Sequence, residues 1–209
     1  MDVDLIVPMK HPRAGKSRLR GAVEAARHPG LVLALASDTL SAVTSAARVR
    51  RVVLVAADPD AVAALAEFGV EIVAEQGQGL NAALRQGEAL LRADDPGGVI
   101  GALQADLPAL RAGDLGDALA EAAGRRAFVA DRQGTGTTLL LSAPGAPLDP
   151  HFGTGSARAH ERSGALAVTG PVASLRSDVD TPGDLEHVCA LGVGKHTAAL
   201  LGEPCVTTR

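Results

Sequence analysis

Acidic side chains follow two apolar segments, at positions where carboxylates could hold a divalent cation. Asp106 comes shortly after the apolar run 99–103, and Asp178 follows Leu175 near the end of a later apolar stretch. The carboxyl ends of parallel strands meet at one edge of a sheet, where ligands bind. Magnesium prefers oxygen ligands together with the phosphates of a substrate. We therefore expect Asp106 and Asp178 to bind Mg²⁺, although Asp106 could instead cap a turn before Leu-Pro.

Asp180 is open to two interpretations. It lies two residues after Asp178 and could join the same cation site. The sequence Asp-Thr-Pro is also a common start of a helix, and Asp180 would then be only its N-terminal cap. Residues 178–180 also form the D-x-D pattern of glycosyltransferases, but they lie late in the chain for that role, and aromatic side chains for stacking on a sugar are scarce.

A basic segment follows the first apolar run. Residues 7–19 read VPMKHPRAGKSRL. Gly15-Lys16-Ser17 looks like the end of a phosphate-binding P-loop, but G-x-x-x-x-G-K-[ST] requires a glycine at position 10, where the chain has Lys10. No G-x-G-x-x-G follows the run either. The segment could neutralise a triphosphate through side-chain charge, with Ser17 as a helix cap, or it could be only a solvated basic turn.

Two later glycine-rich segments could bind an anion. Residues 131–138, DRQGTGTT, offer backbone N–H groups and hydroxyls to a phosphate or carboxylate, but a hairpin turn explains the glycines equally well. Residues 152–160, FGTGSARAH, place a glycine-rich loop before a helix, where free N–H groups and the positive end of the helix dipole would face an anion. Arg158 and His160 add charge to this second segment.

Composition excludes several classes of protein. Hydrophobic residues make up 46% of the 209 residues, which is enough for a globular core. Aromatic residues are only 1% and the net charge is −4, so a nucleic-acid partner is not expected. The two cysteines, Cys189 and Cys205, do not have zinc-site spacing. No run approaches the ~18 apolar residues of a membrane span, and we expect a cytoplasmic protein without a membrane partner.

Short β-branched runs alternate with longer Ala- and Leu-rich patterns. This alternation predicts an α/β fold with a mainly parallel sheet and helices on both faces. We expect one domain over residues 1–193 and a C-terminal tail over 194–209. The predicted strands are 3–7, 51–57, 70–74, 99–103, 127–130, 138–142 and a late one that ends near Val179. The predicted helices are 31–47, 58–68, 80–92, 113–123, 156–163 and one that begins at Asp180-Thr181-Pro182.

Five motifs in this order resemble the 2-phospho-L-lactate guanylyltransferase family. Its high-GC bacterial branch consists of the phosphoenolpyruvate guanylyltransferases of deazaflavin coenzyme F-420 biosynthesis. The motifs are VPMKHPRAGKSRL at 7–19, LQADLPAL at 103–110, ADRQGTGTTLL at 130–140, FGTGSAR at 152–158 and SDVDTPGDL at 177–185. The resemblance implies a single nucleotidyltransferase-type (Rossmann-like) domain that transfers GMP from GTP to a small phosphorylated three-carbon acid and releases pyrophosphate.

The resemblance also implies roles for individual residues. Asp106 and Asp178 match the metal-binding carboxylates, and Lys16 acts with them in catalysis. The acceptor's phosphate and carboxylate would contact Thr137, Gly153 and Ser156, although Thr138 competes with Thr137 because the connection to 153 is about one residue longer than expected. The triphosphate segment matches Pro8, Lys10, Lys16, Ser17 and Arg18, and the segment near the guanine matches Gly79, Leu80 and Asn81.

Several alternatives remain open at this point. The acceptor is phosphoenolpyruvate or 2-phospho-L-lactate, and the resemblance to the bacterial branch favours phosphoenolpyruvate. A nucleotidyltransferase for 3-phosphoglycerate, a sugar phosphate or molybdopterin is a second interpretation, although those enzymes commonly open with a Leu-Ala-Gly-Gly type loop, which is absent here. A non-catalytic nucleotide-binding protein is a third. We expect a monomer or a homodimer.

Overall fold

The computed structural model describes residues 2–19 and 24–202. The strands are β1 (Val3–Met9), β2 (Val49–Ala56), β3 (Glu71–Ala74), β4 (Val99–Leu103), β5 (Ala127–Ala130), β6 (Thr137–Leu141) and β7 (Leu166–Ala167). The α-helices are α1 (His28–Ser45), α2 (Leu80–Asp94), α3 (Ala112–Ala122), α4 (Ser156–Arg162), α5 (Pro182–Leu191) and α6 (Lys195–Leu201). Short 3₁₀ helices are η1 (Ser17–Leu19), η2 (Ala25–Arg27), η3 (Asp60–Phe68) and η4 (Ala173–Arg176).

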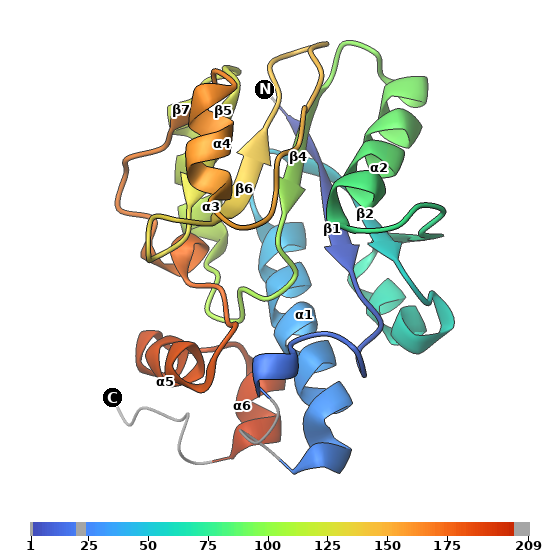
Figure 1. The fold of residues 1–209 in the computed structure, drawn as a ribbon, viewed down its shortest axis with the longest axis vertical. Helices are drawn as coiled ribbons and strands as arrows, with labels where there is room; N and C mark the ends of the chain where they lie inside the picture. The colour runs from blue at the N-terminus through green and yellow to red at the C-terminus, as the bar shows by residue number, and fades with distance from the viewer. Residues whose placement is uncertain (1, 20–23, 203–209) are drawn as a thin grey trace.

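The strands form one mixed sheet in the order β3-β2-β1-β4-β6-β5-β7. β1 pairs in parallel with β2 and β4, and β2 pairs in parallel with β3, whereas β6 runs antiparallel to its neighbours β4 and β5. The predicted α/β class with a mainly parallel sheet is therefore confirmed. In Figure 1 the arrowheads of β1, β2 and β4 point to the end of the molecule where α5 and α6 lie, so the carboxyl ends of these strands share that rim.

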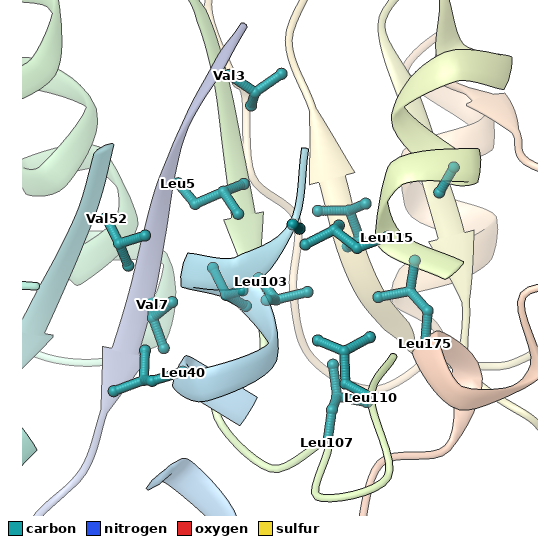
Figure 2. Close-up of a cluster of buried hydrophobic side chains, with 14 of the residues drawn as sticks. Val3, Leu5, Val7, Leu40, Val52, Leu103, Leu107, Leu110, Leu115 and Leu175 are labelled. Atoms are coloured by element: carbon teal, nitrogen blue, oxygen red, sulfur yellow. The ribbon is translucent and has the colours of Figure 1, made fainter. Parts of the chain in front are cut away.

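Alternating residues of the central strands face two separate cores. Leu5 and Val7 of β1 belong to one cluster with Leu40 of α1 and Leu115 of α3, and part of that cluster is drawn in Figure 2. Ile6, between them in sequence, belongs to a second cluster on the other face, together with Leu84 and Leu91 of α2. This period of two is what a strand buried on both faces requires, and it confirms the expectation of helices on both faces.

Helix α2 lies very close to the sheet because glycine occupies the contact point. A Cβ atom built on Gly87 would come within 2.7 Å of Ile6 and within 3.2 Å of Val55. Any side chain at this position would push the helix away from β1 and β2. Since α2 begins at the rim, this close packing fixes where its first residues lie.

A third cluster of buried side chains lies beyond the carboxyl rim. It joins Leu19 of η1 and Leu31 of α1 to Val179, Leu185 and Val188. This packing holds the segment before α5 beside the basic loop after β1. Lys16 and Asp180, which are 164 residues apart in the sequence, are thereby brought into hydrogen-bond contact.

The predicted late strand ending near Val179 is wrong. Residues 173–176 form η4, and the segment 177–179 has no regular structure. Val172, Leu175 and Val179 are buried, but their spacing of three and four residues is that of a turn rather than of a strand. The segment is held at the rim by a hydrogen bond of 3.1 Å from Val179 N–H to the carbonyl of Asp106.

The expected tail contains a helix that packs on the domain. Helix α6 lies against α1, as Figure 1 shows. Both carboxylate oxygens of Asp38 on α1 accept hydrogen bonds from the first turn of α6, from His196 N–H at 3.0 Å and Thr197 N–H at 2.8 Å. The expected boundary at residue 193 therefore does not separate α6 from the domain. Among the described residues, none of the helices has the length and hydropathy that crossing a membrane requires.

Candidate functional site

Lys16 joins two of the predicted acidic residues at the carboxyl rim. Its Nζ donates a hydrogen bond to Oδ2 of Asp106 and another, 2.6 Å long, to Oδ1 of Asp180. The carboxylate of Asp106 is buried, whereas that of Asp180 is exposed. A buried carboxylate is costly without a cation, so Lys16 neutralises Asp106 at the centre of the site.

The backbone around Lys16 is held in an uncommon conformation. Lys16 has a φ of 54°, in the left-handed region. Just before it, the carbonyl of Gly15 accepts a 2.9 Å hydrogen bond from Nε2 of buried His28, at the start of α1. The N–H groups of Ala14 and Gly15 both donate to the carbonyl of His11. The basic segment is therefore an ordered turn that holds Lys16 beside the acidic residues, while the side chains of Lys10 and Arg18 are exposed.

Asp178 lies next to the same group of charges. Burial raises the pKa of the Asp178 carboxyl to about 6; Lys16 lowers it, and the carboxylates of Asp180 and Asp131 raise it. The hydrogen bond from Val179 to the Asp106 carbonyl keeps this segment against the end of β4. The structure therefore brings Asp106 and Asp178 to one rim, as predicted.

Asp180 is not the cap of α5. Thr181 is the N-cap: its side-chain oxygen accepts from the N–H of Asp184, and the Asp184 carboxylate accepts in return from Thr181 N–H at 2.9 Å. This reciprocal pair is a capping box. Asp180 is thus free of the capping role, and its carboxylate pairs with Lys16.

A pocket of about 420 Å³ opens beside Lys16. Its size is typical of a small-molecule site. Predicted nucleotide-binding residues that line it are Pro8, Lys10, Lys16, Arg18, Gly79 and Leu80, and the acidic residues that line it are Glu75, Asp106 and Asp180. The pocket therefore combines a basic loop, the beginning of α2 and the acidic rim of β4. Ser17 begins η1, but its side chain lies outside the described part of the chain.

Gly79 has the backbone geometry that the start of α2 requires. Its φ is 89° and it immediately precedes the helix, a conformation that glycine adopts without steric cost. Leu80 follows as the first helical residue. The chain can turn sharply into the helix here and leave the backbone open to the pocket.

The oxygen atoms at the rim fit a divalent cation. Oδ1 of Asp106 is buried and has no hydrogen-bond partner among the described residues. An unpaired buried carboxylate oxygen beside a pocket suits a hard cation such as Mg²⁺. No cluster of three or more His, Cys, Asp or Glu suited to a metal occurs in residues 2–19 and 24–202. Binding of an ion by Asp106 and Asp178, together with substrate oxygens, stays a prediction.

Asn81 is bonded to the protein rather than directed at the pocket. Its Oδ1 accepts a 2.9 Å hydrogen bond from Phe152 N–H, and its Nδ2 donates at 3.0 Å to the Phe152 carbonyl. One donor of the side-chain amide and its oxygen are therefore both used on the backbone of Phe152. The side chain thus ties the start of α2 to the loop before α4, and the expected contact of Asn81 with the nucleotide stays a prediction.

Thr137 and Ser156 meet in a buried network around His160. Ser156 Oγ donates to Thr137 Oγ1 at 3.2 Å. Nε2 of His160 accepts from His151 N–H at 3.0 Å, so the ring proton lies on Nδ1, which donates to Thr137 Oγ1 at 2.9 Å. Burial lowers the pKa of His160 to about 4, with further lowering by Arg126 and His151, so the ring is neutral at neutral pH.

This network joins β6 to the loop that contains Gly153. His160 is fully buried, and Thr137 and Ser156 are 5% and 2% exposed. Gly153, with a φ of 134°, is exposed. Direct contact of Thr137, Gly153 and Ser156 with an acceptor stays a prediction. The expectation that His160 adds charge to the FGTGSARAH segment is wrong, because its ring is buried and neutral.

The turn 134–136 is a hairpin connection. The carboxylate of Asp131 accepts from Thr135 N–H at 2.8 Å and from Gly136 N–H at 2.7 Å. These two N–H groups are therefore used inside the turn and not offered to an anion. Of the two interpretations of this segment, the hairpin is the one that the structure supports.

Comparisons with known proteins agree with this architecture. The model of a family described as "Guanylyl transferase CofC like" matches residues 3–204. A phosphoenolpyruvate guanylyltransferase of Streptomyces scabiei is 50% identical over 206 residues, which cover 95% of each chain. One of Thermomonospora curvata is 48% identical, covering 94% of this chain and 87% of its own. The solved structure of a 4-diphosphocytidyl-2C-methyl-D-erythritol synthase has a TM-score of 0.62 at 17% identity, covering 91% of this chain and 97% of its own; it shares the fold.

Proposed function

The chain belongs to the CofC-like guanylyl transferase family, and we propose that it transfers GMP from GTP to phosphoenolpyruvate, with release of pyrophosphate. The product would supply the three-carbon unit of coenzyme F-420. The relatives that are about 50% identical carry the name phosphoenolpyruvate guanylyltransferase, which favours this acceptor over 2-phospho-L-lactate.

One observation carries the proposal: a single pocket is lined by the cations of the basic loop and by acidic residues of the rim. Lys10, Lys16 and Arg18 come from the loop after β1, and Asp106 and Asp180 come from the segments after β4 and before α5. A nucleoside triphosphate needs positive charge along its phosphates. A phosphorylated acceptor brings further negative charge, so the basic loop reduces repulsion between the two substrates.

The nucleophile needs no general base. The second pKa of a phosphate monoester is about 6, so the attacking oxygen of phosphoenolpyruvate is largely ionised at neutral pH. This oxygen attacks the α-phosphorus of GTP, a new P–O bond forms, and the bond from the α-phosphorus to the bridging oxygen breaks. The electron pair leaves with pyrophosphate, whose charge Lys16 and Arg18 offset.

Asp106 and Asp178 would hold the divalent ion, for which the unpartnered Oδ1 of Asp106 provides a ligand. When bound, such an ion polarises phosphoryl oxygens as a Lewis acid and orients the two substrates. Lys16, already beside Asp106, would bind the triphosphate next to the ion that the same carboxylate holds. The exposed loop at Gly153 would orient the acceptor.

An acceptor panel tests the proposal. The protein is incubated with GTP and Mg²⁺, and each acceptor is added separately: phosphoenolpyruvate, 2-phospho-L-lactate, 3-phosphoglycerate and glucose 1-phosphate. Pyrophosphate release is measured and the product is identified by mass spectrometry. Phosphoenolpyruvate should give the highest kcat/KM. Preference for 2-phospho-L-lactate or a sugar phosphate would refute the acceptor, and binding of GTP without release of pyrophosphate for any acceptor would favour a non-catalytic protein.

A further inference from the structure

Glu75 is a pocket-lining carboxylate with no assigned partner. It follows β3 directly, and its backbone N–H donates to the carbonyl of Ala56 at the end of β2, at 2.8 Å. Its side chain is half-buried and makes no hydrogen bond or ion pair with any residue that the structure describes. A carboxylate in such a place is available to a ligand.

The two ends of the pocket differ in charge. The carboxyl ends of the strands run across the rim in the order β3, β2, β1, β4. Asp106 lies beyond the end of β4 and Glu75 beyond the end of β3, three strand spacings apart, or about 14 Å at the usual separation of neighbouring strands. Lys16, which donates a hydrogen bond to Asp106, lies at the Asp106 end of this span. A triphosphate bound by Lys16 could extend its base toward Glu75.

The surroundings of Glu75 suit a planar base. Leu80 of α2, which is half-buried, lines the same pocket as Glu75, and the buried side chains of Val55 and Ala83 also belong to its lining. Leu80 can therefore contact the face of a ring and help to exclude water from its edge. A hydrogen bond to a charged carboxylate is stronger in such surroundings than in water.

We propose that Glu75 selects guanine, by accepting hydrogen bonds from N1–H and the 2-amino group of the base. This inference deepens the proposed function and rests on GTP being the nucleotide bound. An ionised carboxylate only accepts hydrogen bonds, and its two oxygens match two adjacent donors. Guanine presents that pair of donors. Adenine and cytosine each present a ring nitrogen that accepts beside their amino group, and this nitrogen would repel the carboxylate.

Binding measurements with three nucleotides test the assignment. Inosine triphosphate lacks only the 2-amino group of GTP, so the wild-type protein should bind it about tenfold or more weakly than GTP. In Glu75→Gln, only the amide oxygen can accept, from N1–H, and the NH₂ group faces the 2-amino donor of guanine, which ITP lacks, so the ratio of the ITP to the GTP dissociation constant should fall to about two or less. The same amide pairs with adenine through its oxygen and its NH₂ group, so preference for GTP over ATP should fall at least about tenfold.

Matched variants separate this role from a structural one. Glu67→Gln makes the same chemical change at an exposed position on η3 outside the pocket, and it should keep the wild-type ratios. A wild-type ITP to GTP ratio near one would overturn the inference even if Glu75→Gln fails to fold. Equal weakening of GTP, ITP and ATP in Glu75→Gln would also overturn it. Because the readout is binding, a protein that selects GTP through Glu75 but transfers no GMP would refute the proposed function alone.

Discussion

The ammonium group of Lys16 donates a hydrogen bond to Oδ2 of Asp106, which lies 90 residues later in the chain. The same ammonium group reaches Asp180, so one cation serves two carboxylates. A second positive charge, from a divalent ion, and the negative charge of a triphosphate would enter the site together. Lys16 could then move from a carboxylate to a phosphate of the triphosphate. The carboxylate would stay neutralised by the incoming ion, and the phosphate would be neutralised by Lys16.

Replacement of Asp106 by asparagine should abolish most of the turnover. The variant keeps the shape of the side chain but removes the charge that neutralises Lys16 and holds the ion, and loss of one such electrostatic element typically lowers kcat by about 10²–10³-fold. Pyrophosphate release with GTP, phosphoenolpyruvate and Mg²⁺ measures it. Asp117→Asn, at an exposed position on α3, is the control and should retain activity. Full activity in Asp106→Asn would contradict the assignment.

Replacement of Lys16 by alanine should mainly weaken the binding of GTP. One charge-assisted hydrogen bond to a phosphate contributes about 1.5–3 kcal/mol, which corresponds to roughly a 10- to 150-fold rise in the dissociation constant. Equilibrium binding of a fluorescent GTP analogue reports the change. Lys195→Ala, which removes an exposed ammonium at the start of α6, should bind as the wild type does. An unchanged dissociation constant in Lys16→Ala would count against a phosphate contact.

Replacement of Asn81 by alanine should affect the acceptor more than the nucleotide. The change removes both hydrogen bonds to the Phe152 backbone, and since Phe152 is buried, we expect a loss of about 1–3 kcal/mol in the free energy of unfolding. The KM for phosphoenolpyruvate should rise because the loop at Gly153 loses its anchor. Urea unfolding and steady-state kinetics measure the two effects, with exposed Gln78→Ala as the control. A rise in the KM for GTP alone would show that Asn81 contacts the nucleotide instead.

Local patterns in the sequence were sufficient to predict most of the strands and helices. The strand 99–103 has the predicted bounds because it is continuously apolar and buried on both faces. The segment before Asp178 was predicted wrongly because Val172, Leu175 and Val179 are buried at a spacing that a short apolar run does not distinguish from a strand. The predicted basic loop and acidic rim follow from the rule that ligands bind at the carboxyl ends of parallel strands.

Contacts between distant parts of the chain could not be predicted in the same way. Asn81 and Phe152 are 71 residues apart, and nothing in the sequence around Asn81 indicates that its amide is used on that backbone. The sequence left the role of Asp180 open because both Asp and Thr can act as the N-cap of a helix, so that either Asp180 or Thr181 could cap α5. Only the three-dimensional structure shows that Thr181 caps the helix and that Asp180 pairs with Lys16.

The buried network around His160 predicts how stability depends on pH. The folded-state pKa of about 4 is lower than the usual value of 6.5, because a protonated ring would be buried and its Nε2 could no longer accept from His151 N–H. Between these two pH values the unfolded chain binds a proton that the folded protein does not. The stability contribution is therefore fully present above pH 6.5 and is lost as the pH falls toward 4, by roughly 3 kcal/mol.

Urea unfolding at pH 7, 6, 5 and 4 measures this loss, and His160→Asn isolates it. Asparagine can still donate to Thr137 from a position near that of Nδ1, but it does not titrate, so its unfolding free energy should fall less than that of the wild type over the same range. His187→Asn, on α5 outside the network, should keep the wild-type slope. If His160→Asn and the wild type lose stability equally between pH 6.5 and 4, His160 takes up its proton over the same pH range in the folded and unfolded protein, and the network does not depend on a neutral ring.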